Sequence, residues 1–150
     1  MSLEKPTNLD FLCMKTAQEM VNCQGKTGDK ENVATKALGV LLENGPYGLM
    51  LYLETSSDKQ KGIAKHYQSK LVSLCAEERI QAYITGGVKV PNGGNFSSIT
   101  DWLRGIAQDL DSYLFVKQLW QQSLTYARYH AKALEQGSGA GQGEAQEEEG

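Results

Sequence analysis

The fold is decided by residues 33–53, which read VATKALGVLLENGPYGLMLYL. Apolar side chains in the first half of this stretch recur at helical spacing and form one stripe of Ala34, Ala37, Leu38, Leu41 and Leu42. After them, Gly45 suits the left-handed conformation that closes a helix, and Pro46 suits the first turn of a new helix. The stretch therefore predicts an apolar helical hairpin at the centre of a helical domain.

Helix-start signals place further helices on both sides of the hairpin. Capping boxes occur at residues 7–10, 57–60 and 98–101, and Asp29 is the expected N-cap of the helix that enters the hairpin. Asp109 or Asp111 is expected to begin the longest helix, which reaches Glu135. These patterns predict an all-α fold, in which residues 1–135 form a single helical bundle domain of about six helices with a long C-terminal helix.

Two segments lack a helical pattern. Residues 85–98 contain four glycines, Pro91 and two asparagines, which exclude a helix and predict a surface loop or a segment that becomes ordered against a partner. Residues 136–150 are rich in Gly, Gln and Glu, so they have too little apolar surface to offset the entropy of ordering. We expect a disordered acidic Gly/Glu-rich tail there.

Charge separates the body of the chain from this tail. All fifteen Lys and Arg residues but only fourteen of the eighteen acids precede residue 136, so the body carries a net charge of +1. Affinity for nucleic acid scales with the number of phosphates neutralised, so a nearly neutral body is a poor nucleic-acid binder on its own.

The chain has no pattern of a metal or membrane protein. Cys13, Cys23 and Cys75 are odd in number and include no C-x-x-C pair, while His66 and His130 lack ligand spacing. We expect reduced, mostly buried thiols, no metal and no cofactor. No apolar run approaches the ~20 residues that span a bilayer, so a soluble cytoplasmic protein is expected.

Lysines gather on the helix predicted to begin at residues 57–60. This group consists of Lys59, Lys61, Lys65 and Lys70. On a helical wheel Lys61 and Lys65 lie opposite the apolar face, and Lys59 and Lys70 border it. The group is a candidate for contact with RNA phosphates; the alternative is a solvated helix face.

The long last helix has three usable faces. Its core stripe consists of Tyr113, Val116, Trp120, Leu124, Ala127, Ala131 and Leu134. One border carries Lys117, Gln121, Arg128 and Lys132, and its three basic residues, Lys117, Arg128 and Lys132, are candidates for RNA binding. The other border carries Leu119, Gln122, Tyr126, Tyr129 and His130. Because a monomer needs only one apolar stripe, this aromatic border predicts a partner interface at Leu119, Tyr126, Tyr129 and His130. The alternative is that a neighbouring helix of the same domain covers it.

Two short motifs carry a family resemblance. Residues 41–45, Leu-Leu-Glu-Asn-Gly, and residues 126–131, Tyr-Ala-Arg-Tyr-His-Ala, lie in an all-helical chain with a long closing helix. In these features the chain resembles the small all-helical subunit, the fifth of the Cmr series, of the type III-B CRISPR RAMP-module (Cmr) effector complex. The chain departs from the family at Tyr129, where members often carry a second basic residue.

The resemblance implies a non-catalytic structural subunit of an RNA-guided, RNA-targeting complex in antiviral defence. Such subunits stack with copies of themselves as a minor filament beside the subunits that hold the guide RNA. Their basic faces border the channel of the guide–target RNA duplex. The implied partners are therefore other Cmr effector subunits, further copies of the chain and that duplex, with no membrane.

Two other functions compete with this expectation. A nuclease needs clustered acids for a metal, or a histidine with a partner, and neither is spaced for that work here. We therefore expect no enzyme. A helical adaptor that binds protein partners only shares every core feature with the preferred function and differs in whether the basic side chains contact RNA.

Overall fold

In the computed structural model, residues 8–84, 89–91 and 95–149 are described, with side chains up to Gly137. The elements of this part of the chain are all helices: α1 (Leu9–Val21), α2 (Thr27–Glu54), α3 (Lys61–Cys75), α4 (Glu78–Gln81), α5 (Phe96–Ile106) and α6 (Leu110–Glu149). The prediction of an all-α single domain with a long C-terminal helix is confirmed.

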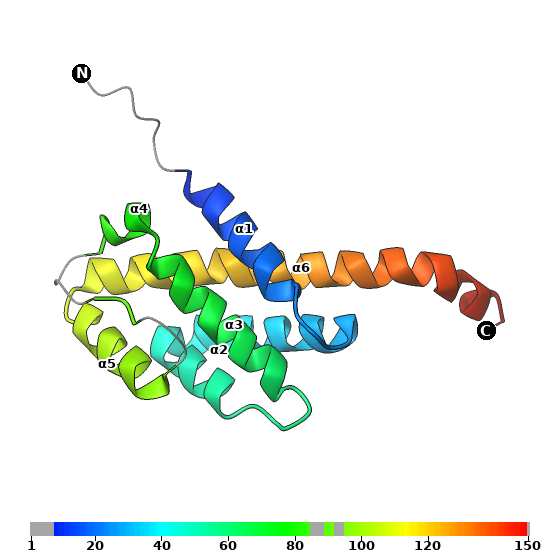
Figure 1. The fold of residues 1–150 in the computed structure, drawn as a ribbon, viewed down its shortest axis with the longest axis horizontal. Coiled ribbons are helices and arrows are strands. Elements are labelled where there is room, and N and C mark those ends of the chain that lie inside the picture. The colour runs from blue at the N-terminus through cyan, green and yellow to red at the C-terminus, as the bar shows by residue number, and fades with distance from the viewer. Residues whose placement is uncertain (1–7, 85–88, 92–94, 150) are drawn as a thin grey trace, which may run out of the picture.

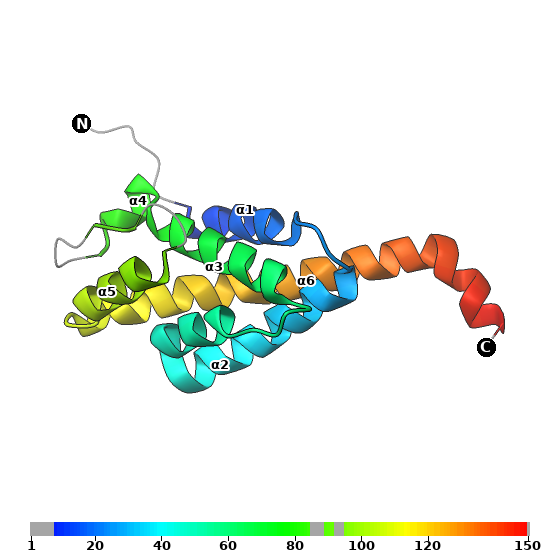
Figure 2. The ribbon, with the colours of Figure 1, turned by 60° about the horizontal axis from the view of Figure 1, so that its bottom comes forward.

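The long helix α6 is the axis of the bundle. α1 and α2 pack along it on different sides, and α3 packs against both α1 and α2 (Figures 1 and 2). The core lies between these helices and contains Trp102, Trp120 and Tyr67, each almost fully buried. The indole Nε1 of Trp120 donates to the carbonyl oxygen of Leu71 at 2.9 Å, which joins α6 to α3 through the core.

Helix α2 consists of two helical segments that meet at Gly45. Gly45 has φ 80° and ψ −176°, and Pro46 begins the second segment, as the sequence predicts. The chain changes direction sharply at this point (Figure 2). The two segments approach closely, because a Cβ added to Gly48 would lie 2.5 Å from the Cβ of Asn44.

Three predicted helix starts are wrong. Asp29 lies in the first turn of α2, whose N-cap is Lys26. α3 begins at Lys61 because residues 57–60 form a turn, in which the Gln60 N–H donates to Ser57 O at 3.0 Å. α5 begins at Phe96, because the side chain of Asn95 caps it by accepting from the N–H of Ser98 at 3.2 Å. At α5 a second short polar residue takes the capping role, and spacing alone does not rank such candidates. The N-cap side chains of α2 and α3 make no capping hydrogen bond, so these helices begin without the predicted caps.

One further cap differs by a residue and one agrees. Asn8 caps α1 by accepting from the N–H of Phe11 at 2.9 Å, whereas the capping box at residues 7–10 begins at Thr7, which lies outside the described residues. Asp109 accepts from the N–H of Ser112 at 3.2 Å and from its hydroxyl at 2.6 Å at the start of α6.

α6 continues past Glu135, where the sequence predicts the end of the ordered domain, and runs to Glu149. This part of the helix extends beyond the other helices (Figure 1). Near the predicted boundary, the carboxylate of Glu135 lies beside Gly28 of α2. A Cβ atom added to Gly28 would be only 3.0 Å from Glu135 Oε2. Leu134, predicted for the core stripe, is 44% exposed, so it does not belong to the core. The division of the chain at residue 135 stays a prediction.

Candidate functional site

Three basic side chains form a row on one side of α6. Lys117, Arg128 and Lys132 project within about 60° of one another at ~100° per residue. Lys117 and Arg128 are half-buried, and Lys132 is exposed. Within the described part of the chain, none of the three forms an ion pair with a carboxylate. This α6 row therefore has positive charge available for an anionic partner.

Arg128 is the most constrained member of the α6 row. Its Nε is buried and has no hydrogen-bond partner among the described residues. Its guanidinium carbon lies 5.3 Å from the centroid of the Tyr129 ring, within the range of a cation–π contact. These contacts hold the head group at the helix surface.

On α3, Lys65 is occupied by a contact within the domain. It forms an ion pair with Glu54 of α2, and this hydrogen bond is the main reason that the pKa of Glu54 is lowered. Glu54 also accepts a hydrogen bond from the buried Gln68 at 3.3 Å. Lys65 therefore joins α3 to α2 and is less available to RNA than the sequence predicts.

Lys59, Lys61 and Lys70, the other lysines that the sequence groups with Lys65, lie in different surroundings. Lys59 is exposed and forms a long ion pair with Asp29 at 3.9 Å. Lys70 lines a small groove between α1 and α3, together with Lys15, Glu19 and Glu77, so two acids balance the two cations there. Lys61 is exposed at the start of α3. The four lysines therefore do not form one uniformly basic surface.

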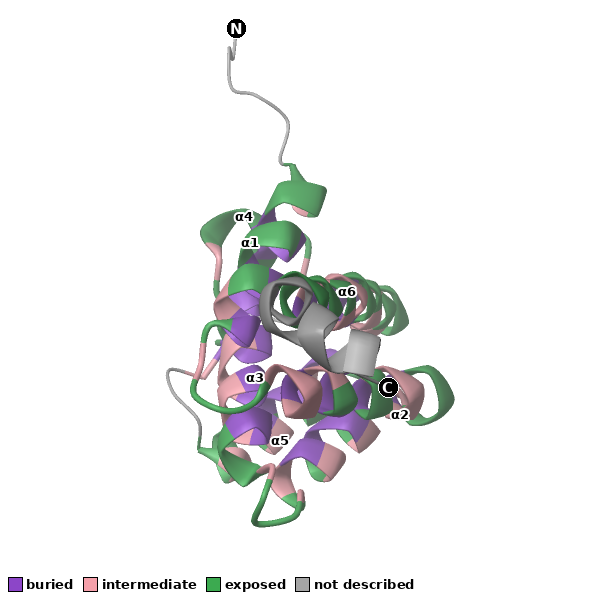
Figure 3. Cartoon of the chain, turned by 90° about the vertical axis from the view of Figure 1, so that its right-hand side faces the viewer, coloured by how far each residue is buried: buried purple, intermediate pink, exposed green. Residues whose placement is uncertain are grey.

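The α3 lysines and the α6 row do not lie on a common face. Trp120 and Leu71 meet on the buried sides of α6 and α3, so the exposed sides of these helices point in different directions. Figure 3 shows α3 and α6 on different sides of the bundle. An RNA strand that follows the α6 row would not reach the α3 lysines of the same molecule.

α1 covers half of the aromatic border that the sequence predicts for partners. Leu119 is only 4% exposed, and its carbonyl oxygen accepts from the Cys13 thiol at 3.6 Å. The hydroxyl of Tyr126 donates to the carboxylate of Asp10. The prediction of a partner interface at Leu119 is therefore wrong, and Tyr126 also contacts α1. Tyr129, 55% exposed, and the half-buried His130 lie further along α6.

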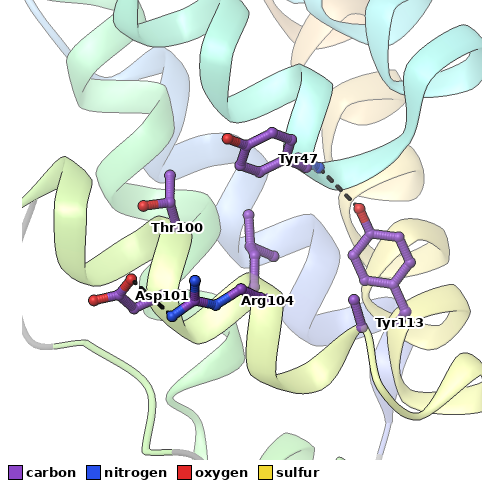
Figure 4. A pocket seen from close by; sticks show the side chains of 7 residues that line it. Tyr47, Thr100, Asp101, Arg104 and Tyr113 are labelled. Atoms are coloured by element: carbon purple, nitrogen blue, oxygen red, sulfur yellow. Dashed lines mark hydrogen bonds and ion pairs between the residues drawn. The ribbon is translucent and has the colours of Figure 1, made fainter.

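A pocket of about 280 Å³ lies where the second segment of α2, α5 and the start of α6 meet (Figure 4). Its lining consists of Tyr47, Thr100, Asp101, Leu103, Arg104, Ala107 and Tyr113. No pattern in the sequence predicts this pocket, because its residues come from three separate segments. The only local signal is the Gly45-Pro46 break, which turns the next residues of α2 toward α5.

The thiols follow the sequence expectation. Cys13, Cys23 and Cys75 are free; the first and last are buried and Cys23 is half-buried. Burial raises the pKa of all three thiols, most strongly that of Cys75. A raised pKa leaves little of the reactive thiolate at neutral pH.

Within the described residues, no group of three or more His, Cys, Asp or Glu side chains is placed to hold a metal ion. None of the described helices is both long and apolar enough to cross a membrane.

Comparisons of the chain with protein-family models, with curated proteins and with solved structures found no match.

Proposed function

We propose that this chain is a non-catalytic structural subunit of a cytoplasmic CRISPR Cmr effector complex, which is guided by RNA and targets RNA. It stacks with copies of itself as a minor filament beside the subunits that hold the guide RNA. It contacts the guide–target RNA duplex through the α6 row. The Cmr assignment rests on the resemblance at residues 41–45 and 126–131. The observation that supports RNA contact is that Lys117, Arg128 and Lys132 share one side of a long helix without a carboxylate partner among the described residues.

The charge of the chain fits weak binding by one copy and strong binding by many. With three phosphate contacts, the logarithm of the RNA-binding constant falls by roughly 2 to 3 for each tenfold rise in salt concentration. This dependence is small for a nucleic-acid binder. Copies in a filament bind one duplex together, so their contributions combine through a high effective concentration. Contacts to phosphates position the RNA without reading its sequence.

The arrangement of the basic residues ranks the candidates. The α6 row comes first, and Lys61 is the best candidate on α3 because it is exposed. Lys59 and Lys65 face carboxylates of α2, and Lys70 shares its groove with two acids. In the proposed complex these three lysines contribute little to RNA affinity.

The test is RNA binding titrated against salt, by the purified chain alone and together with partner subunits of a Cmr complex. We expect weak binding by the chain alone and tight, salt-sensitive binding after assembly. Lys117→Glu and Lys132→Glu lower the affinity and reduce the salt slope. The matched control is Lys15→Glu, which makes the same charge change at an exposed lysine of α1, on the groove with Glu19 and Glu77.

Two outcomes would overturn the proposal in different ways. If the chain assembles but charge reversal in the α6 row leaves RNA affinity unchanged, the chain is a helical adaptor that binds protein only. If it does not assemble with Cmr subunits at all, the Cmr assignment is wrong.

A further inference from the structure

The pocket of Tyr47, Arg104 and Tyr113 presents side chains from three helices around one opening (Figure 4). Tyr47 is 48% exposed, so part of its ring surface is open to a ligand. Leu103 and Ala107 contribute apolar surface from α5. The pocket therefore combines aromatic, apolar and charged groups within about 280 Å³.

The aromatic side of the pocket is held in place. The backbone N–H of Tyr47 donates to the hydroxyl of Tyr113 at 3.1 Å, which fixes the second segment of α2 relative to α6. The bond holds the Tyr113 ring and the backbone of Tyr47 in place, so a ligand meets a partly preformed site, which lowers the entropy lost on binding.

The polar side of the pocket keeps free hydrogen-bonding capacity. Arg104 Nη2 lies 3.8 Å from Asp101 Oδ1, which is longer than a hydrogen bond, and the two side chains are 84% and 69% exposed. Both groups are thus open to a ligand. Thr100 adds a hydroxyl beside them, which donates to the carbonyl oxygen of Ser97 at 3.0 Å and can still accept a hydrogen bond. Because the Arg104 and Asp101 charges cancel, the pocket has no preference for a simple anion.

This combination fits a nucleobase better than a phosphate or an apolar side chain. Single-stranded nucleic acids are held by bases that stack on aromatic rings, with Arg groups nearby. A carboxylate accepts from the amino groups of bases, and a hydroxyl serves base donors or acceptors. An apolar protein side chain would use the rings but make no hydrogen bond to Asp101 or Arg104.

The pocket lies at one end of the α6 row. Tyr113 and Lys117 are four residues apart on α6, so their side chains are neighbours on the same side of the helix. From Tyr113 to Lys132 the helix rises about 28 Å at ~1.5 Å per residue. An RNA strand whose phosphates follow the α6 row would bring its next nucleotide to Tyr47.

We propose that this pocket binds one unpaired, unstacked base of an RNA strand where that strand continues beyond the guide–target duplex, with the base held on Tyr47 and contacted by Asp101 and Arg104. The site deepens the proposed function, on which it rests, because it adds a base contact to the phosphate contacts of the α6 row. One RNA strand would thus make two kinds of contact with each copy of the chain.

The experiment measures the binding of single-stranded RNA, by the full chain alone and in the assembled complex, with fluorescence anisotropy at several salt concentrations. The probe is a labelled oligonucleotide carrying 5-iodouridine, which crosslinks to stacked aromatic side chains under ultraviolet light. We expect crosslinking to the peptide that contains Tyr47. Tyr47→Ala lowers the affinity about 5- to 100-fold without changing the salt slope, because base stacking is independent of counterion release.

Control variants separate base binding from folding. Tyr47→Phe keeps the ring and retains most of the affinity. Tyr83→Ala removes a tyrosine of similar exposure, 52%, outside the pocket and leaves RNA affinity unchanged. Tyr47→Ala keeps the backbone N–H that donates to the Tyr113 hydroxyl, so the variant is expected to fold. Arg104→Gln gives a second test, because the Arg104 side chain is highly exposed.

The outcomes distinguish this inference from the proposed function. If Lys132→Glu weakens RNA binding while Tyr47→Ala and Arg104→Gln do not, and no crosslink reaches Tyr47, the base site is refuted and the phosphate contacts stand. If Tyr47→Ala prevents assembly but leaves the RNA affinity of the chain alone unchanged, the pocket binds protein. If neither the chain nor the assembled complex requires the α6 row for RNA, both proposals fall.

Discussion

The hydroxyl of Tyr113 accepts a hydrogen bond from the backbone N–H of Tyr47 at 3.1 Å, across 66 residues of sequence. Tyr47 is the second residue after the break at Gly45, so its N–H lies in the first turn of a new helical segment. N–H groups in a first turn have no carbonyl partner within their own helix. A side chain of α6 therefore caps the second segment of α2 and fixes its position in the bundle.

Replacing Tyr113 by Phe removes this cap while keeping the ring. We expect Tyr113→Phe to lower the free energy of unfolding by about 0.5–1.5 kcal/mol, the net value of a typical hydrogen bond. Chemical denaturation followed by circular dichroism measures the change. The control is Tyr129→Phe, because that hydroxyl has no hydrogen bond among the described residues. Equal losses in both variants would show that the Tyr113–Tyr47 bond does not stabilise the fold.

The break in α2 depends on Gly45. Its backbone, with φ 80° and ψ −176°, lies in a region that is essentially restricted to glycine. Gly45→Ala is therefore expected to destabilise the protein by about 1–3 kcal/mol. Gly39→Ala is the matched control in the same helix: a Cβ there meets nothing within 4 Å, and the change is expected to stabilise by about 0.5–1 kcal/mol. A thermal denaturation scan that gives both variants the same midpoint would contradict this.

The Glu54–Lys65 ion pair predicts a pH dependence of stability. The pKa of the Glu54 carboxyl is lowered from its ordinary value of 4.5, chiefly by the hydrogen bond from Lys65. Above about pH 4.5 the carboxyl is ionised in both states, and the full stabilisation is present. As the pH falls further, the unfolded chain binds the proton first, and the stabilisation is lost as the pH passes through the folded pKa.

The size of this effect is limited because the Glu54 and Lys65 side chains are 28% and 36% exposed. We expect at most about 1 kcal/mol. Urea unfolding at a series of pH values measures it, and Glu54→Gln should remove the corresponding part of the pH dependence. Glu43→Gln, at an exposed acid of α2, should leave the profile unchanged.

Because α1 covers only part of the aromatic border of α6, we expect substitutions at Leu119 and Tyr129 to change the stability of the protein by different amounts. Leu119→Ala leaves a cavity between α6 and α1 and is expected to cost about 2–5 kcal/mol of stability. Tyr129→Ala removes an exposed ring and is expected to change stability by about 0.5 kcal/mol or less. Calorimetric unfolding of both variants measures the difference. A small loss for Leu119→Ala would mean that α1 does not pack on this border.

The thiols are expected to react in an order set by burial. A thiol reagent such as Ellman's reagent should modify Cys23 first in the folded protein, because Cys13 and Cys75 are buried and their pKa values are raised. All three should react at similar rates in denaturant. Cys23→Ser should remove the fast phase. A fast phase that persists in this variant would place Cys13 or Cys75 at the surface.

The sequence by itself determined the features that depend on neighbouring residues. Helical spacing of apolar side chains and the Gly45-Pro46 break are local, because each rests on backbone conformation or on residues within about four positions. The structure chose Asp109 over Asp111, the two starts that the sequence offered for α6. Free, mostly buried thiols were predicted for a related reason, since composition and spacing alone argue against a disulfide or zinc framework.

Tertiary structure alone decided the surroundings of the candidate functional residues. Lys65 and Lys61 have the same charge and share a helix face, but only the first meets Glu54, which comes from another helix. Leu119 is covered because α1, more than a hundred residues away in sequence, packs on it. The pocket at Tyr47 exists because three separate segments converge. Helical periodicity defines which side chains share a face, whereas packing between distant helices defines which faces stay open to a partner.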